Sequence, residues 1–162
     1  MKTIRVMSKG QIQENEVINT YIVNYFDLGG HSIAETQKFA IGKNATIEKA
    51  HQLGRILEVE ANDVEITEEN IKKSKDKNSY PIKLFNLEEA KRVVDFIESH
   101  KDSDFVFQCD FGRSRSLTTA VFAQKYILQE HEILVRKQFI YNKSVYRLLA
   151  RAYLFPNKTF DW

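Results

Sequence analysis

The sequence predicts an α/β protein with a single domain, built on a central, mostly parallel sheet of about four or five strands with helices on both faces. Two observations predict it. Short runs of β-branched and aromatic residues alternate with stretches of helical periodicity, the pattern of a parallel sheet covered by helices. The length of 162 residues, with 43% hydrophobic and 28% charged residues, suits one globular unit with its own core, so we expect one domain over residues 1–162.

The composition excludes several classes of protein. The formal net charge of +2 is too small to indicate a nucleic-acid or membrane-surface partner, and no apolar run approaches the length of about 18 residues that spans a bilayer. The polar start MKTIRVMSKG is unlike a secretory signal. Cys109 is the single cysteine, which excludes an intramolecular disulfide and suits a reducing compartment. We therefore expect a cytoplasmic protein with no DNA partner and no membrane insertion.

The first half of the chain contains the signals of three strands and two short helices. Alternating or β-branched and aromatic residues predict strands over residues 3–7, 18–26 and 55–61. Helices are expected over residues 8–16 and 46–53, the second ending at Gly54, the residue type favoured just past a helix C-terminus. Residues 33–41 fit a helix or a strand equally well.

The second half is more regular. It begins with the polar stretch 67–80, which predicts a short helix or an exposed loop. Asn86 and Glu89 have the spacing of a capping box, and apolar residues at helical spacing follow to about His100. The remaining elements expected are a strand over 105–109, a helix with a broad apolar face over 114–130, a connection over 131–141 and a helix over 143–154.

The chemistry is expected around Cys109, where a strand, a glycine-containing loop and a helix follow one another. From Cys109 the spacing is two residues to Gly112 and two more to Arg115, followed by Ser116. Five residues between Cys109 and Arg115 allow the backbone to form a bowl of inward N–H groups, at a helix N-terminus that favours negative charge. This geometry predicts a phosphate site formed by Asp110, Phe111, Gly112, Arg113, Ser114 and Arg115.

Three side chains of this segment have expected roles in catalysis. The helix terminus lowers the pKa of a cysteine placed there, so we expect Cys109 to act as a thiolate nucleophile. Arg115 offers a planar fork that matches two oxygens of a phosphoryl group and can hold them in the transition state. The Ser116 hydroxyl is close enough in sequence to donate to the thiolate and ease its departure from a phosphocysteine.

The segment CDFGRSRS, from Cys109 to Ser116, resembles the signature of the protein tyrosine phosphatase superfamily, in particular its small dual-specificity-like members. That signature has a cysteine, five residues, an arginine and then serine or threonine, with an inner glycine. The resemblance implies hydrolysis through a phosphocysteine, with no cofactor and no metal; the four histidines also show no metal-ligand spacing. Gln108 stands where the family has a histidine that helps to set the loop and the thiolate, which bears on the activation of Cys109 but not on the fold.

The resemblance also implies a general acid, which in the family is an aspartate on a mobile loop after a strand and some tens of residues before the cysteine. Asp63 is the preferred residue because it follows the predicted strand 55–61 and precedes a polar segment. It would protonate the leaving oxygen and later take a proton from the attacking water. A turn or helix-capping role for Asp63 stays open; Asp27 is the alternative acid, and Asp76 is less favoured because its surroundings are rich in lysine.

Several functions remain open at this point. The favoured one is a phosphatase of phosphotyrosine or dual-specificity type, acting on a phosphorylated protein or a small aryl phosphate. Arg113 adds charge to the loop, offset by Asp110. In the resembled superfamily, extra basic loop residues go with polyanionic substrates, so the resemblance implies a polyphosphorylated small molecule or an RNA 5′-end as the next substrate class. A phosphate-binding module without catalysis is the alternative from another class. A rhodanese-like or arsenate-reductase-like enzyme is weaker, since arsenate reductases of this type use further cysteines.

Overall fold

Five parallel strands form one sheet in the computed structural model, which describes residues 1–8, 20–28, 45–78, 81–109, 114–134 and 141–157. The strands are β1 (Thr3–Ser8), β2 (Thr20–Phe26), β3 (Ile56–Glu60), β4 (Asp104–Cys109) and β5 (Glu132–Leu134). Their order across the sheet is β3-β2-β4-β1-β5, and every neighbouring pair is parallel. The predicted α/β fold with about four or five mostly parallel strands is confirmed.

The strand β4 lies at the centre of this sheet, between β2 and β1. Its residues pair with β1 up to Ser8 opposite Cys109, and with β2 up to Asn24 opposite Gln108. The run Phe105-Val106-Phe107 is completely buried because helices and neighbouring chain cover both faces of the strand. Cys109 therefore stands at the carboxyl end of the most deeply buried strand, the edge at which α/β sheets bind ligands.

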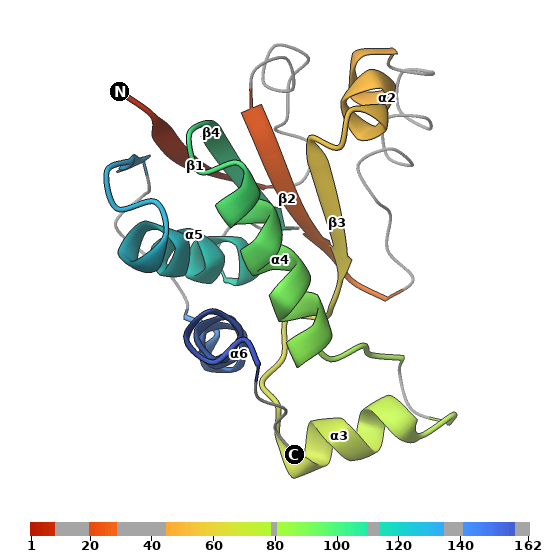
Figure 1. Ribbon diagram of the computed structural model, residues 1–162. Helices are drawn as coiled ribbons and strands as arrows, with labels where there is room; N and C mark the ends of the chain where they lie inside the picture. The colour runs from red at the N-terminus through yellow and green to blue at the C-terminus, as the bar shows by residue number, and fades with distance from the viewer. Residues whose placement is uncertain (9–19, 29–44, 79–80, 110–113, 135–140, 158–162) are drawn as a thin grey trace.

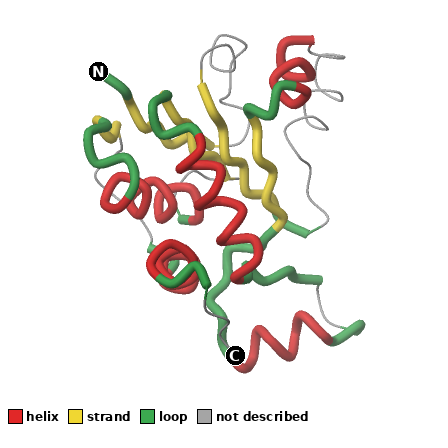
Figure 2. The backbone as a smooth tube through the Cα atoms, viewed as in Figure 1, coloured by secondary structure: helices red, strands yellow, loops and turns green. Residues whose placement is uncertain are grey.

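Helices cover the sheet unequally. They are α2 (Ala45–Gln52), α3 (Glu68–Lys75), α4 (Leu87–Ser99), α5 (Arg115–Tyr126) and α6 (Lys143–Leu154). Figure 1 shows α4, α5 and α6 together on one side of the sheet, where α6 contacts both of the others. Ala50 of α2 packs on the opposite face, against Ile22, Ile56 and Val106. In Figure 2, α3 stands apart from the sheet, and it contains no buried residue.

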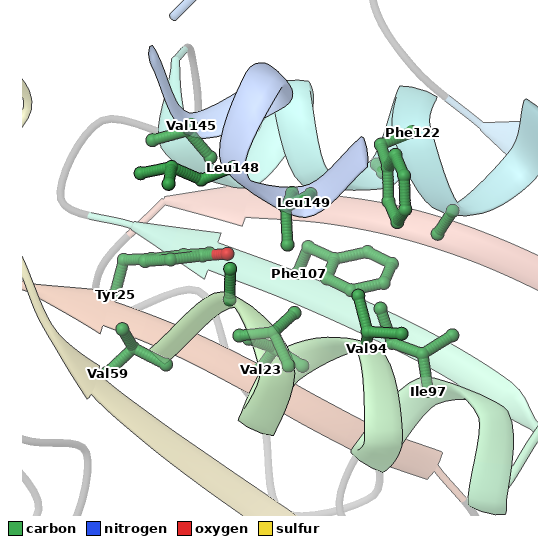
Figure 3. Close-up of a cluster of buried hydrophobic side chains, with 14 of the residues drawn as sticks. Val23, Tyr25, Val59, Val94, Ile97, Phe107, Phe122, Val145, Leu148 and Leu149 are labelled. Atoms are coloured by element: carbon green, nitrogen blue, oxygen red, sulfur yellow. The ribbon is translucent and has the colours of Figure 1, made fainter. Parts of the chain in front are cut away.

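The main core lies between the sheet and the three helices of the first face. Figure 3 shows Val23, Tyr25 and Phe107 from the strands pointing toward the helical layer. The helices contribute Val94, Ile97, Phe122, Val145, Leu148 and Leu149 to the same cluster. Alternate residues of each strand face this core, as the two-residue period of a strand requires. Among the described residues, none of the helices is both long and apolar enough to cross a membrane.

Most predicted elements are found with small shifts in their ends, and two differ. The helix expected over 114–130 ends at Tyr126, because the N–H groups of Ile127 and Leu128 both turn back to the Ala123 carbonyl and Leu128 packs into the core. The expected connection 131–141 begins with β5, which pairs with β1. Three residues are too few to show an alternating pattern. The expected helix 8–16 and the ambiguous segment 33–41 lie mostly or wholly outside the described residues.

Candidate active site

Cys109 and the first turn of α5 lie against each other at the carboxyl end of the sheet. Cys109 ends β4 with its side chain in the main core and 2% exposed, and α5 begins at Arg115. The Sγ atom of Cys109 is 3.0 Å from the Oγ atom of Ser116, which is fully buried. The predicted cysteine and serine are thus within hydrogen-bonding distance of each other.

The surroundings of Cys109 favour its thiolate. Burial by itself raises the pKa of the Cys109 thiol. Hydrogen bonds from the Ser116 hydroxyl and the Ser116 N–H, the positive charge of Arg115 and the Ser114 N–H outweigh this effect and hold the pKa below its ordinary value. The donors belong to the start of α5, where backbone N–H groups have no partner within the helix. The predicted lowering of the pKa therefore has a structural cause in these donors.

Arg115 is buried and held from one side by the ends of two strands. Arg115 is 2% exposed. Its Nη1 atom donates to Asp27 Oδ1 at 2.7 Å and to the Ala61 carbonyl at 2.6 Å. Asp27 directly follows β2 and Ala61 directly follows β3. The guanidinium is planar, so fixing one nitrogen on these two oxygens restricts the orientation of the whole group.

Asp63 contacts Ser114, the residue immediately before α5. Its Oδ1 atom accepts hydrogen bonds from the Ser114 hydroxyl at 2.7 Å and from the Asn142 side-chain amide at 2.9 Å. Ser114 is the N-cap residue of α5, but its hydroxyl makes no capping bond within the helix and donates to Asp63 instead. The preferred acid Asp63 and the alternative Asp27 are thus both close to the site, Asp63 on Ser114 and Asp27 on Arg115.

Asp76, the least favoured acid, is the C-cap residue of α3, and its carboxylate accepts the Asn78 N–H at 2.9 Å. It therefore takes part in the turn that ends an exposed helix.

Gln108 lies on the face of β4 opposite to Cys109. Its side chain is almost completely buried and its Nε2 atom donates to Asn24 Oδ1 at 2.9 Å, while Asn24 Nδ2 donates to Glu58 Oε2 at 2.6 Å. These contacts tie β4 to β2 and β2 to β3. The glutamine thus connects the strands beneath the site, on the face turned away from the thiol.

A second buried chain of hydrogen bonds supports the first turn of α5. The Thr119 hydroxyl donates to the Arg115 carbonyl at 2.8 Å, so the Tyr25 hydroxyl, 2.7 Å from Thr119 Oγ1, is the donor to it. Tyr25 is fully buried, and burial raises its pKa far above the ordinary value. The phenol therefore stays neutral and joins β2 to the helix turn that begins with Arg115.

The predicted phosphate ligands Asp110, Phe111, Gly112 and Arg113 lie outside the described residues, so their roles stay predictions. Asn142 was not expected at the site. Its place immediately before the predicted helix 143–154 was the available signal, since asparagine is a favoured N-cap, although nothing in that signal indicates Asp63 as a partner.

No protein-family model, no curated protein and no solved structure matches the chain.

Proposed function

We propose that the protein is a cysteine-dependent phosphatase that hydrolyses phosphate monoesters through a phosphocysteine intermediate. The observation that carries the proposal is the position of Cys109 at the start of α5, 3.0 Å from the Ser116 hydroxyl and followed by the buried Arg115, with its pKa held below the ordinary value. A thiolate nucleophile beside a fixed guanidinium fork suits attack on a phosphoryl group.

The first step transfers the phosphoryl group to the enzyme. The Cys109 thiolate attacks phosphorus, the S–P bond forms and the bond from phosphorus to the ester oxygen breaks. Asp63 donates its proton to the departing oxygen, which leaves as an alcohol or phenol. Arg115 and the backbone N–H groups of the loop stabilise the charge on the other phosphoryl oxygens.

The second step returns the enzyme to its starting state. Water attacks the phosphocysteine, Asp63 takes a proton from this water, and the S–P bond breaks to release inorganic phosphate. The Ser116 hydroxyl donates to the sulfur as it leaves with the electron pair, which lowers the barrier for this departure. No step of this scheme uses a metal ion or a cofactor.

The preferred substrate class is phosphotyrosine in proteins or a small aryl phosphate. A polyphosphorylated small molecule or an RNA 5′-end is the alternative, supported by Arg113 in the loop sequence. A panel of phosphotyrosine peptides, inositol phosphates and 5′-phosphorylated RNA, compared by kcat/KM, distinguishes these classes. A preference for the inositol phosphates or the RNA would refute the assignment to aryl phosphates.

Hydrolysis of p-nitrophenyl phosphate tests the proposal. Wild-type turnover should be blocked by vanadate, and Cys109→Ser should abolish turnover while phosphate binding remains. Because Cys109 is the single cysteine, a phosphoryl adduct on the intact rapidly quenched protein, lost in Cys109→Ser, can be assigned to its sulfur. Ser74→Ala, on the exposed helix α3, is the control and should match the wild type. Turnover that survives Cys109→Ser refutes the mechanism.

A phosphate-binding module without catalysis is the second candidate. The observation that favours it is Gln108, whose amide contacts Asn24 on the opposite face of β4, in the position where the resembled family has a histidine. The expected result for such a module is phosphate or vanadate binding without turnover. A Cys109 thiol titrating near the reference value of about 8.5 would also support it.

A further inference from the structure

Hydrogen bonds join the chain segment after β3 to the first turn of α6 and its N-cap residue. Asn142 Nδ2 donates to Asp63 Oδ1 at 2.9 Å and to the Val64 carbonyl at 3.4 Å. Two residues further on, the Ile66 N–H donates to the Ser144 hydroxyl oxygen at 2.7 Å. The residues on the two sides of these contacts are almost 80 positions apart in the sequence, so only the fold brings them together.

Glu65 makes this attachment stronger by capping α6 from outside the helix. Its carboxylate accepts the N–H groups of Lys143 and Ser144 at 2.8 and 2.9 Å, and also the Ser144 hydroxyl. These N–H groups are among those that a helix start leaves without an internal partner, and the helix dipole favours a negative charge there. The segment from Asp63 to Ile66 is therefore held at four successive residues.

The backbone N–H and both polar side-chain atoms of Asn142 make hydrogen bonds. Its Oδ1 atom accepts the Val145 N–H at 3.0 Å, and its own N–H donates to the Thr118 hydroxyl of α5 at 3.0 Å. The residue is 3% exposed. Because Val145 requires an acceptor and the Asp63 carboxylate requires a donor, these partners determine the orientation of the amide. Asn142 therefore has one available arrangement, and in it the NH₂ group faces Asp63.

We propose that Asn142 is a positioning residue for Asp63 and that, together with Glu65, it holds the Asp63 carboxyl group beside Ser114 in position to donate a proton. This inference rests on the proposed phosphatase function. Asp63 Oδ1 accepts both the Asn142 amide and the Ser114 hydroxyl, so the proton that Asp63 delivers is placed on Oδ2. The resembled family places its acid on a mobile loop, whereas here hydrogen bonds to α6 fix the acid-bearing segment.

The test uses leaving groups of different quality. A good leaving group such as p-nitrophenolate departs with little help, whereas phenolate needs a proton from the acid. Asn142→Ser keeps a favoured N-cap for α6 but removes the NH₂ donor to Asp63. We expect kcat for phenyl phosphate to fall about 10- to 100-fold, the cost of a misplaced catalytic group, with less than about a 3-fold change for p-nitrophenyl phosphate.

Matched variants show whether the effect passes through Asp63. Asp63→Asn should give the same dependence on the leaving group, and adding Asn142→Ser to it should cause no further loss. Asn86→Ser is the control, because Asn86 caps α4 through the Glu89 N–H at 2.8 Å in the way that Asn142 caps α6. Asn86→Ser should leave kcat unchanged for both phenyl phosphate and p-nitrophenyl phosphate. Glu65→Gln, which weakens the same attachment from the other side, should reproduce the selective loss in milder form even if Asn142→Ser folds poorly.

The outcomes separate this inference from the function on which it rests. Equal losses for the two esters in both Asn142→Ser and Glu65→Gln, or additive losses with Asp63→Asn, would overturn the positioning role while leaving a phosphatase in place. A wild-type protein that hydrolyses neither ester would overturn the proposed function itself. A selective loss for phenyl phosphate, absent in Asn86→Ser, is the supporting result.

Discussion

The Ser116 hydroxyl should control how readily Cys109 reacts. Its Oγ atom lies 3.0 Å from the Cys109 Sγ atom, and both residues are almost completely buried. Ser116→Ala removes the strongest of the donors that lower the Cys109 pKa, while the Arg115 charge and the backbone N–H groups remain. We expect the pKa of Cys109 to rise in this variant, because the buried thiolate loses a donor that bulk water does not replace.

The size of the effect follows from the kind of hydrogen bond that is lost. A hydrogen bond to a charged group contributes about 1.5 to 3 kcal/mol, and each 1.4 kcal/mol changes an equilibrium about tenfold. Sulfur is a weak acceptor, so the low end of this range applies. At a pH where most of the thiol is protonated, the thiolate population should therefore fall about tenfold, and alkylation should slow by a similar factor.

The assay is the rate of iodoacetamide alkylation as a function of pH. The single cysteine makes mass spectrometry of the intact protein specific for Cys109, and alkylation in denaturant gives the reference for an unperturbed thiol. Ser74→Ala is the matched control, because the Ser74 hydroxyl donates to the Ile71 carbonyl on the exposed helix α3. It should keep the wild-type profile. An unchanged pH midpoint in Ser116→Ala would refute the role assigned to this hydroxyl.

Two further predictions concern charged partners of the site. Asp27→Ala should lower the free energy of unfolding by about 1 to 2 kcal/mol, since Arg115 loses a carboxylate partner that is 41% exposed, and added phosphate should restore part of this loss. Asp102→Ala, which removes an exposed ion pair with Lys2, is the control, and equal urea midpoints for the two variants would contradict the prediction. Glu65→Gln tests a carboxylate whose pKa is lowered in the folded protein. Burial raises the pKa of Glu65, but the Ser144 hydroxyl, the Lys143 and Ser144 N–H groups and the Lys143 charge lower it overall. The carboxylate therefore stabilises the fold above its unfolded pKa, and this contribution disappears as the pH falls through the folded pKa. The gap in urea midpoint between wild type and variant should be present at neutral pH and close in acid; a gap that stays constant with pH would exclude this origin.

The parts of the fold that the sequence predicts are those with a strong local pattern. The helix Lys143–Leu154 matches its predicted range, because its apolar positions recur at helical spacing. The strand Glu132–Leu134 was missed because its pairing with β1 depends on the rest of the sheet. Strand order has no local pattern at all, so the placement of β4 between β1 and β2 could not be predicted.

The same distinction applies to the candidate site. Cys109, Arg115 and Ser116 lie within eight residues of one another, so the spacing alone indicated that they would share a loop and a helix start. The contact between Asp63 and Asn142 joins positions 79 residues apart and depends on how α6 packs. Asn142, which only tertiary packing brings to Asp63, is therefore the residue that the sequence alone could not indicate.

The partners of the two candidate aspartates support Asp63 as the acid. Asp27 Oδ1 is 2.7 Å from the Nη1 atom of the buried Arg115, so a protonated Asp27 would leave this cation opposite a neutral carboxyl group. Asp63 accepts from the Ser114 hydroxyl and the Asn142 amide, which are neutral donors and remain compatible with a proton on the other carboxylate oxygen. Proton delivery from Asp27 would disturb the group that we propose to hold phosphate, whereas delivery from Asp63 leaves Arg115 in place. The two carboxylates therefore suit different tasks, orientation of the guanidinium for Asp27 and proton transfer for Asp63.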